Sequence, residues 1–291
     1  MNGDYQAVLR AIAAAYNCAS ATPRHTLRLT LSVIVITKNE AAHIEACLAS
    51  VAFASEWIVV DSASSDNTAE RARKFGARVV ASDDWPGFGV QKQRALDRAT
   101  GRWVLSIDAD ERVSPELAAR IAAVVGGVAG SEPFAAYELD RLSQMSGRWI
   151  RHGDWYPDRV VRLFLRDRAR FSADLVHERV VVDGPVGRLG GDLLHYTMPT
   201  FEDALAKMNR YSSGRAADRL AAGGRGGVGP ALAHAAWAFV RSYVIRRGFL
   251  DGAAGFIVAS YIAEGTWWRY LKVAELARRL PAADSGDSAG H

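Results

Sequence analysis

The segment LSVIVITKNE, residues 31–40, opens with a strand-length run of mostly apolar and β-branched residues and closes in a polar turn. Similar apolar runs follow at WIVVD (57–61), RVVAS (78–82) and WVLSID (103–108). Between them lie stretches of about 10–12 residues with apolar side chains at helical spacing. Continuous apolar strands that alternate with helices predict βαβ units and a parallel sheet covered on both faces.

The helices between and after these strands have recognisable ends. We expect helices over 40–51, 68–75 and 90–99, the second capped by Asp66-Asn67-Thr68 and closed by Gly76, and a further helix from Pro115 to about Val125. Residues 135–196 show short strands and loops, and the pattern beyond Pro199 is helical to about Leu280 with breaks near 223–230 and 247–255. The sequence thus predicts an N-terminal extension (1–30), a catalytic domain (31–198), a C-terminal helical region (199–280) and a disordered tail (281–291).

The composition is that of a globular protein. Of 291 residues, 49% are hydrophobic and 23% are charged, which excludes collagen-like, disordered and disulfide-scaffold classes. The net charge of +4 is compatible with anionic partners. The Lys and Arg residues are dispersed along the sequence, which argues against a nucleic-acid-binding protein. The two cysteines, Cys18 and Cys47, have no metal or redox spacing. Ala11–Ala15 is too short for a secretory signal, and no apolar run reaches the ~18 residues of a membrane span.

Polar residues follow each predicted strand, at the sheet edge where ligands of such folds collect. The first strand leads into Thr37-Lys38-Asn39-Glu40 and not into the glycine-rich loop of a dinucleotide-binding domain. The fourth ends in Asp108-Ala109-Asp110, two carboxylates that together can hold one Mg²⁺ or Mn²⁺ ion with open positions for diphosphate oxygens. The competing interpretation is an ordinary solvated turn.

Several separated motifs together closely resemble family 2 glycosyltransferases with the GT-A fold. They include LSVIVITKNE, IVVDSASSDNT (58–68) and LSIDADE (105–111). The later motifs WPGFGVQKQRAL (85–96), RWIRHGDWYPD (148–158), LVHERV (175–180) and RGFLDG (247–252) resemble the bacterial lipopolysaccharide-core type of that family. The resemblance spans about residues 31–280 and implies an α/β GT-A fold with a mostly parallel central sheet and a C-terminal helical region.

The resemblance also implies roles for single residues. Asp108 and Asp110 match the metal-ligand pair, and His195 resembles a histidine that completes the metal or diphosphate site, although a structural histidine is equally consistent. Residues expected to bind the nucleotide-sugar are Thr37, Glu40, Asp61, Lys92, Asp108, Arg159 and Arg162. Lys92 could equally be a solvated helix lysine, and the arginines suit phosphate because a guanidinium can bind it in a bidentate manner.

The acceptor side needs one carboxylate base, because a single inverting displacement must remove the acceptor hydroxyl proton. The best match is Glu178, with Asp154 and Asp158 as its competitors. A structural ion pair is the competing interpretation for Glu178. Aromatic side chains suited to a sugar face, or to plain packing, are Trp149, Trp155 and Tyr156.

The C-terminal region combines aromatic and basic residues. Trp237, Trp267, Trp268 and Tyr270 alternate with Arg241, Arg246, Arg247, Arg269 and Lys272. Such helices suit a membrane interface, and they would also suit a helical cap or a dimer surface. We therefore expect a cytoplasmic enzyme that is peripheral on the inner face of the cytoplasmic membrane, of unknown oligomeric state.

These features predict a metal-dependent inverting glycosyltransferase. It would move a hexose such as glucose from a nucleotide-diphosphate sugar, most plausibly UDP-linked, to a hydroxyl of a lipopolysaccharide core or related envelope glycan. Transfer to polyprenyl phosphate is the nearest competing activity, although such enzymes usually carry transmembrane hairpins. A sugar-nucleotide-binding protein without activity and a metal-dependent hydrolase are further possibilities.

Overall fold

The computed structural model describes residues 31–128, 130–172 and 178–279. The expected extension (1–30) and tail (281–291) lie outside the described residues. The chain divides into two compact units. One, here called the sheet unit, comprises residues 31–142 and 158–196, and the other, the helical unit, comprises 143–157 and the residues from 197 onward. The expected boundary near 198 lies at the end of the last strand, whereas residues 143–157 group with the helices.

The first half of the sheet unit alternates strands and helices, as the sequence predicts. Its elements are β1 (Leu31–Thr37), α2 (Ile44–Ser50), β2 (Glu56–Asp61), α3 (Thr68–Phe75), β3 (Arg78–Ala81), α4 (Phe88–Leu96), β4 (Trp103–Asp108), β5 (Glu111–Val113) and α5 (Pro115–Val125). Gly76 ends α3 in the left-handed conformation, at φ 103°. The second half is mainly extended, with β6 (Ala136–Met145), β8 (Asp158–Leu165), β9 (Ala169–Phe171), β10 (Val180–Val182) and β11 (Val186–Met198). The short strand β7 (Arg148–Trp149) pairs with the end of β6 and belongs to the helical unit.

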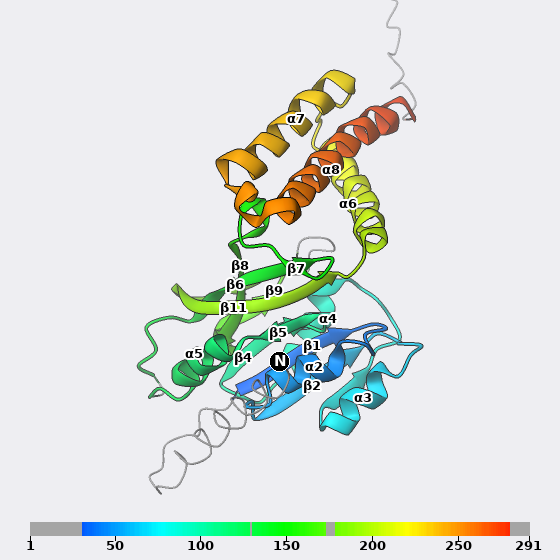
Figure 1. The fold of residues 1–291 in the computed structure, drawn as a ribbon. Helices are drawn as coiled ribbons and strands as arrows, with labels where there is room; N and C mark the ends of the chain where they lie inside the picture. Colours follow the sequence, from blue (N-terminus) through cyan, green and yellow to red (C-terminus); the bar gives the residue numbers. More distant parts are fainter. Residues whose placement is uncertain (1–30, 129, 173–177, 280–291) are drawn as a thin grey trace, which may run out of the picture. The chain divides into compact units, whose positions relative to one another are not determined.

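The central sheet is mixed. Its strand order is β3-β2-β1-β4-β8-β6-β11-β5, and β7 pairs with β6 (Figure 1). The four strands at the β3 end are parallel, as predicted. Beyond β4 the pairing becomes antiparallel, because β8 returns alongside β4 and β6 alongside β8. The expectation of a mostly parallel sheet therefore applies to its first half only.

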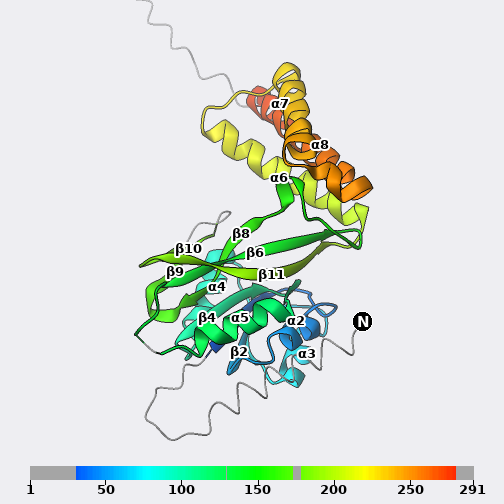
Figure 2. The same cartoon turned by 60° about the vertical axis from the view of Figure 1, so that its left-hand side comes forward.

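The alternation of side chains along the strands separates two hydrophobic layers. On β1, Val33 and Val35 face the layer that α2, α3 and α5 cover, whereas Ile34 and Ile36 face the layer that α4, β9 and β10 cover (Figure 2). On β4, Leu105 faces the first layer and Val104 the second. Asp108, four residues after Val104, falls on the α4 side by the same alternation.

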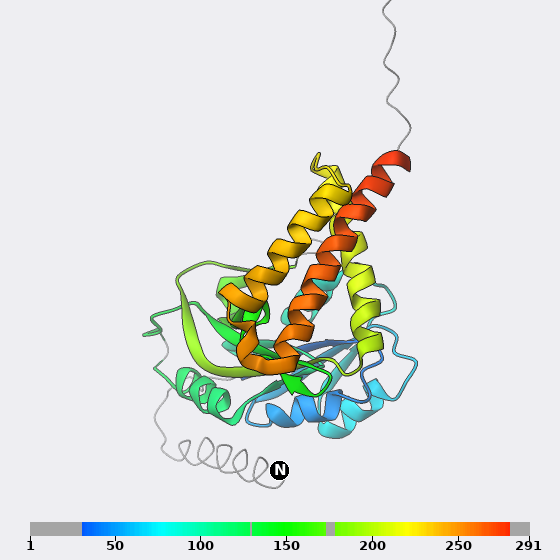
Figure 3. The same ribbon diagram turned by 45° about the horizontal axis from the view of Figure 1, so that its top comes forward.

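The helical unit contains α6 (Phe201–Ala221), α7 (Val228–Val240) and α8 (Gly252–Arg279), and α8 runs between the other two (Figures 1 and 3). A π-helical turn, η3 (Arg241–Ile245), and a 3₁₀ turn, η4 (Gly248–Asp251), connect α7 to α8. Its small core consists of Met145, Ile150, Met198, Ala204, Ala254 and Val258. Within the described residues, none of the helices is both long and apolar enough to cross a bilayer.

Candidate active site

The first edge of the site is the turn after β1, which is fastened to the loop after β2. Thr37 and Asp61 lie side by side in the β1–β2 register, and the Thr37 hydroxyl donates to Asp61 Oδ1 at 3.0 Å. Ser64 donates to Asp61 from both its backbone N–H (3.1 Å) and its hydroxyl (2.6 Å). Asp61 is therefore buried and engaged by the chain itself. These contacts fasten the turn after β1 to the loop after β2.

Four charged side chains meet at the carboxyl end of β4. Lys92 Nζ lies 3.1 Å from Asp108 Oδ1 and 3.2 Å from Glu178 Oε1. Arg162 Nη2 lies 2.6 Å from the other oxygen of Asp108. The structure thus gathers the predicted Lys92, Asp108, Arg162 and Glu178 from α4, β4, β8 and the segment before β10.

Burial makes this cluster electrostatically strong. Burial alone would raise the pKa of Asp108, but the positive charges of Arg162 and Lys92 outweigh it and hold that pKa well below its usual range. Burial would likewise lower the pKa of Arg162, and the carboxylates of Asp108 and Glu111 instead raise it. Asp108 is therefore ionised and Arg162 charged at any physiological pH.

Two members of the cluster escaped the sequence analysis. Glu111 is fully buried, lies 2.7 Å from Arg162 Nη2, and accepts a hydrogen bond from the backbone N–H of Asp108 at 2.9 Å. Arg141 lies 3.4 Å from Glu111 and 2.6 Å from Asp158. In the sequence, Glu111 could have been noticed because it directly follows Asp108-Ala109-Asp110. It lies in a short strand that ends in the buried Val113.

The second aspartate points to a different partner. Asp110 Oδ2 lies 3.2 Å from His195 Nε2, because β5 and β11 pair with His195 opposite Glu111. The backbone of Tyr196 also donates to the Asp110 carbonyl at 2.9 Å. The acids nearby repel one another. Burial, followed by the charges of Asp110, Asp66 and Asp108, raises the pKa of Glu40 to about 7. The carboxylates of Asp110, Asp66 and Asp108 thus lie close enough to act on Glu40.

Three other predicted residues have different ion-pair partners, and Asp158 reaches the cluster through Arg141. Arg159 lies 3.8 Å from Asp140 and is half exposed. Asp158, one of the two competing bases, forms its ion pair with Arg141. Asp154, the other one, belongs to the helical unit, where Arg241 (2.8 Å) and Arg246 (3.1 Å) neutralise it. Each of the three candidate bases is therefore engaged in an ion pair, Glu178 with Lys92 and the other two with arginines.

The predicted acceptor aromatics belong to the helical unit. Trp155 packs edge-on against Tyr261, with ring centroids 5.9 Å apart, at the edge of that unit's core. Trp149 lies on β7 opposite Gln144, and Tyr156 is partly buried. Trp155 therefore packs within the helical unit.

The predicted membrane-facing aromatics and cations are only partly exposed. Tyr270 is buried, with the His234 ring stacked on it at 4.4 Å, and Lys272 donates to Asn209, Ser212 and Ser213 of α6. Trp237 and Trp268 are exposed. Tyr270 and Lys272 therefore hold the helices together.

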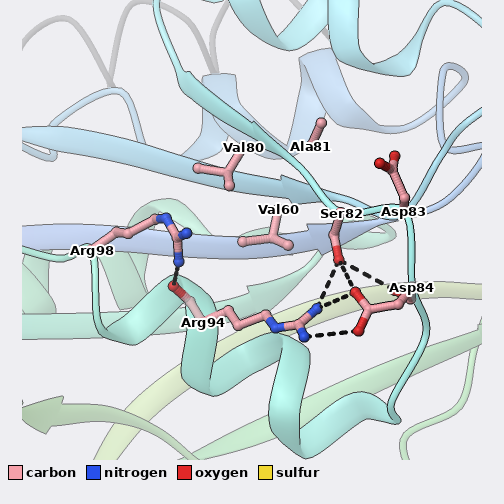
Figure 4. Close-up of a pocket in the computed structure, with 8 residues that line it drawn as sticks. All are labelled: Val60, Val80, Ala81, Ser82, Asp83, Asp84, Arg94 and Arg98. Carbon is pink, nitrogen blue, oxygen red and sulfur yellow. Dashed lines mark hydrogen bonds and ion pairs between the residues drawn. The ribbon is translucent and has the colours of Figure 1, made fainter.

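A cavity of about 410 Å³ lies beside the ends of β2 and β3 (Figure 4). It is lined by Val60, Val80, Ala81, Ser82, Asp83, Asp84, Arg94 and Arg98. Arg94 Nη1 forms an ion pair with Asp84 Oδ1 at 2.5 Å, and this hydrogen bond lowers the pKa of Asp84 to about 2. The Gln91 amide bridges Ser82 to Ser62, next to Asp61. The cavity is therefore linked through Gln91 to Ser62, the residue that follows Asp61.

The comparisons with known proteins agree with this geometry. The family model described as glycosyl transferase family 2 matches residues 32–152. An uncharacterised glycosyltransferase from Rickettsia bellii is 32% identical over 269 residues, which cover 88% of this chain and 90% of the relative. The lipopolysaccharide core biosynthesis glycosyltransferase LpsC from Rhizobium meliloti is 28% identical over 258 residues, covering 87% and 93%.

The fold has a relative among solved structures. The mannosyltransferase PcManGT from Pyrobaculum calidifontis, solved in complex with GDP-Man and Mn²⁺, superposes with a TM-score of 0.52 at 16% identity, over 95% of this chain and all of that one. The mixed sheet, its covering helices and the polar carboxyl edge are those of the GT-A fold. By its sequence relatives and its fold, the chain belongs to glycosyl transferase family 2.

Proposed function

We propose that this protein is an inverting glycosyltransferase that moves a hexose such as glucose from a UDP-linked sugar to a hydroxyl group of a lipopolysaccharide core acceptor. The observation that carries the proposal is the cluster at the end of β4, where Lys92 lies within 3.2 Å of both Asp108 and Glu178. The acceptor class is supported by the similarity to LpsC over most of both chains.

The donor diphosphate needs positive charge, and Lys92 and Arg162 supply it. Both side chains are buried, and each contacts Asp108. The Nε–H of Arg162 is also buried and has no acceptor among the described residues. A buried donor without a partner costs about 1–3 kcal/mol, and a phosphate oxygen is a strong acceptor for a guanidinium. We assign both residues to the diphosphate.

Asp110 and His195 are the residues that would hold a divalent cation, Mg²⁺ or Mn²⁺. They lie 3.2 Å apart, and burial, followed by the negative charge of Asp110, raises the pKa of the nearby Glu40 to about 7. Both oxygens of Asp108 are engaged by Lys92 and Arg162, so Asp108 fits a positioning role better than direct ligation. No group of three His, Cys, Asp or Glu side chains of the described residues could hold a metal ion alone, so donor oxygens and water would have to complete the coordination. The cation would stabilise charge on the departing diphosphate.

Glu178 is the proposed base. Its carboxylate takes the proton of the acceptor hydroxyl while that oxygen bonds to the anomeric carbon and the bond from that carbon to the diphosphate breaks. One displacement inverts the anomeric configuration, and the electron pair of the broken bond leaves with the nucleoside diphosphate. A lipid-linked acceptor would place this reaction at the inner face of the cytoplasmic membrane.

The test is a transfer assay with UDP-glucose, UDP-galactose, UDP-N-acetylglucosamine and GDP-mannose, and truncated lipopolysaccharide as the acceptor. We expect one UDP-sugar to add a single sugar, detected by mass spectrometry, with an inverted anomeric configuration in the NMR spectrum. Transfer with retention, or donor hydrolysis without transfer at any acceptor, would contradict the proposal.

A further inference from the structure

The turn between α7 and α8 exposes an unusual number of large apolar side chains. Ten of the eighteen exposed large hydrophobic residues in the described part of the chain lie between Val228 and Ile257. Those around the turn form what we call the turn surface: Trp237, Val244, Ile245, Phe249, Leu250 and Phe256. Each is about half exposed, from 47% for Phe249 to 56% for Ile245. Large apolar side chains exposed together around one turn are typical of an interaction surface.

Helix α7 and the first twelve residues of α8 carry no charged side chain. Residues 226–240 and 252–263 contain no Asp, Glu, Lys or Arg. A helix in contact with water normally carries charged residues on its outer face, but α7 has none although Leu232 and Trp237 are exposed. Its outer face is therefore suited to an apolar environment.

The backbone of the turn is held in place by ion pairs, a hydrogen bond and a close glycine contact. Asp154 pairs with Arg241 and Arg246, and the backbone N–H of Gly153 donates to the Arg246 carbonyl at 2.9 Å. A Cβ on Gly255 would overlap the carbonyl oxygen of Gly248, so η4 and α8 approach as closely as glycine permits. The exposed apolar residues are thus presented by a braced backbone.

The charge around the turn surface is positive. Residues 197–279 hold twelve Lys and Arg against six Asp and Glu, although the whole chain has a net charge of only +4. At the turn, Arg241 and Arg246 share the one carboxylate of Asp154, with their side chains about half exposed. Arg247 is exposed and has no ion-pair partner among the described residues. Exposed arginines beside apolar side chains match the headgroup and acyl layers of an anionic bilayer.

We infer that the turn surface docks onto an anionic phospholipid bilayer, with Ile245, Phe249 and Leu250 entering the boundary between headgroups and acyl chains. Trp237 would lie at headgroup level, where indole rings gather. The arginines of the turn would contact phosphates. This membrane docking rests on the proposed function, because a lipid-linked acceptor would be held at the bilayer.

The test uses the full chain and vesicles of phosphatidylcholine with and without phosphatidylglycerol. The expected result is co-sedimentation that increases with phosphatidylglycerol and falls with salt. The Ile245→Glu/Leu250→Glu variant should bind about tenfold more weakly or worse, because two charges would enter the apolar layer. The matched control is Phe201→Glu/Leu205→Glu on α6, two side chains that are equally exposed. It should bind within about twofold of the unmodified protein.

A second variant and a second readout keep the test independent of folding. Arg247→Gln should reduce the increment due to phosphatidylglycerol and leave the basal binding unchanged. Brominated lipids should quench the protein fluorescence, and Trp237→Phe should remove part of that quenching. Unmodified protein that ignores anionic vesicles would overturn the inference, as would equal binding by the Ile245/Leu250 variant. A dimer that this variant disrupts, without vesicle binding, would overturn it too and assign the surface to a second copy.

Nucleotide binding separates this inference from the proposed function. If the Ile245/Leu250 variant loses vesicle binding but keeps its thermal shift with UDP and Mn²⁺, the donor site and the turn surface are distinct. If unmodified protein binds vesicles but no nucleotide, the proposed function fails and the turn surface stands.

Discussion

Lys92 joins the two acids to which we assign different roles. Its ammonium group is buried and lies about equally far from Asp108 and Glu178. A buried lysine normally requires such partners, since an uncompensated charge in the interior is expensive. The arrangement fixes Glu178 beside the diphosphate residues, although 86 positions separate it from Lys92 in the chain.

Replacing the proposed base should abolish transfer without removing the donor. In Glu178→Gln the amide still accepts a hydrogen bond from Lys92 but cannot take a proton at neutral pH. We expect transfer to fall by about 10²–10⁴-fold, the usual contribution of a general base. UDP binding, measured by calorimetry, should stay within about threefold of the unmodified value, which is under 1 kcal/mol. Asp158→Asn is the matched comparison, and a greater loss of transfer there than in Glu178→Gln would move the base to Asp158.

Glu40 should give the protein an unusual pH dependence. Its pKa is about 7 in the folded state, against 4.5 for an ordinary glutamate, so the folded protein holds the proton more tightly than the unfolded chain does. Stability is therefore lost as the pH rises from about 4.5 through 7. After discounting for partial exposure we expect roughly 1–3 kcal/mol. Glu40→Gln should remove this loss.

The measurement is the melting temperature at pH 5 and pH 8. The difference between the two should shrink in Glu40→Gln and stay unchanged in Glu116→Gln, where the carboxylate is exposed and pairs only with Arg120. An identical pH response of Glu40→Gln and the unmodified protein would show that the acids near Asp110 do not repel Glu40.

Helix α4 reaches the site because Gly89 lets it approach the segment before β10. A Cβ on Gly89 would overlap the carbonyl oxygen of Ser172 and lie 3.4 Å from the Glu178 Cβ. The same helix carries Lys92 on its buried face. The position of α4 therefore sets the geometry of both Lys92 and Glu178.

Gly89→Ala should impair transfer through this displacement. We expect a loss of about tenfold to a hundredfold, since a shift of about 1 Å in a reacting group can have that effect. Gly214→Ala is the control, because Gly214 lies in α6 with nothing within 4 Å of a Cβ. It should leave transfer unchanged and stabilise the helix by about 0.5–1 kcal/mol. Kinetic assays of both variants would decide, and full activity in Gly89→Ala would contradict the role of this contact.

The elements that the sequence predicts best are those with a local signal. β1 and β4 are continuous apolar runs, and α3 begins after Asn67 and ends at Gly76 as its sequence predicts. The Asn67 side chain makes no capping hydrogen bond, and Asp66 instead accepts from the backbone N–H of Thr68. The first helix is shorter than expected, starting at Ile44, because the residues after Glu40 form a turn whose backbone bonds to the Glu40 carbonyl.

The antiparallel half and its charge pairs depend on contacts between distant residues. The register of β6 and β8 shifts between Tyr137 and Glu138, which leaves Arg162 as an extra residue and turns it toward Asp108. Nothing local in the sequence reveals this bulge. The ion pairs of Asp154 could not be predicted from the sequence either, because Arg241 and Arg246 lie some ninety positions away along the chain.

The chain as a whole passes from the sheet unit into the helical unit and back before it enters α6. Residues 143–157 depend on later residues for their bonding, because the backbone N–H groups of Arg151 and His152 donate to Asp251. Met145 and Ile150 lie in the core of the helical unit. The two units are therefore not separable by a single cut.

Truncation after Tyr196 should yield an aggregation-prone protein. It would expose Met145 and Ile150 and leave the Asp154 carboxylate without its arginines. We expect elution as aggregate in size-exclusion chromatography and rapid proteolysis within 143–157. Co-expression of residues 197–291 should restore solubility. A monomeric truncated protein with an unchanged melting temperature would contradict the interleaved arrangement.

The central claim is that Asp110 and His195 support cation-dependent binding of a sugar nucleotide, and nucleotide binding tests it most directly. We would measure the melting temperature with UDP, GDP, CDP and dTDP, each with and without Mn²⁺, in the unmodified protein, Asp110→Asn and the exposed control Asp167→Asn. A ligand at 100 times its dissociation constant stabilises by about 2.7 kcal/mol. We expect a shift with UDP that requires Mn²⁺, persists in Asp167→Asn and disappears in Asp110→Asn. A UDP shift that is independent of Mn²⁺, or equal in Asp110→Asn, would contradict the account.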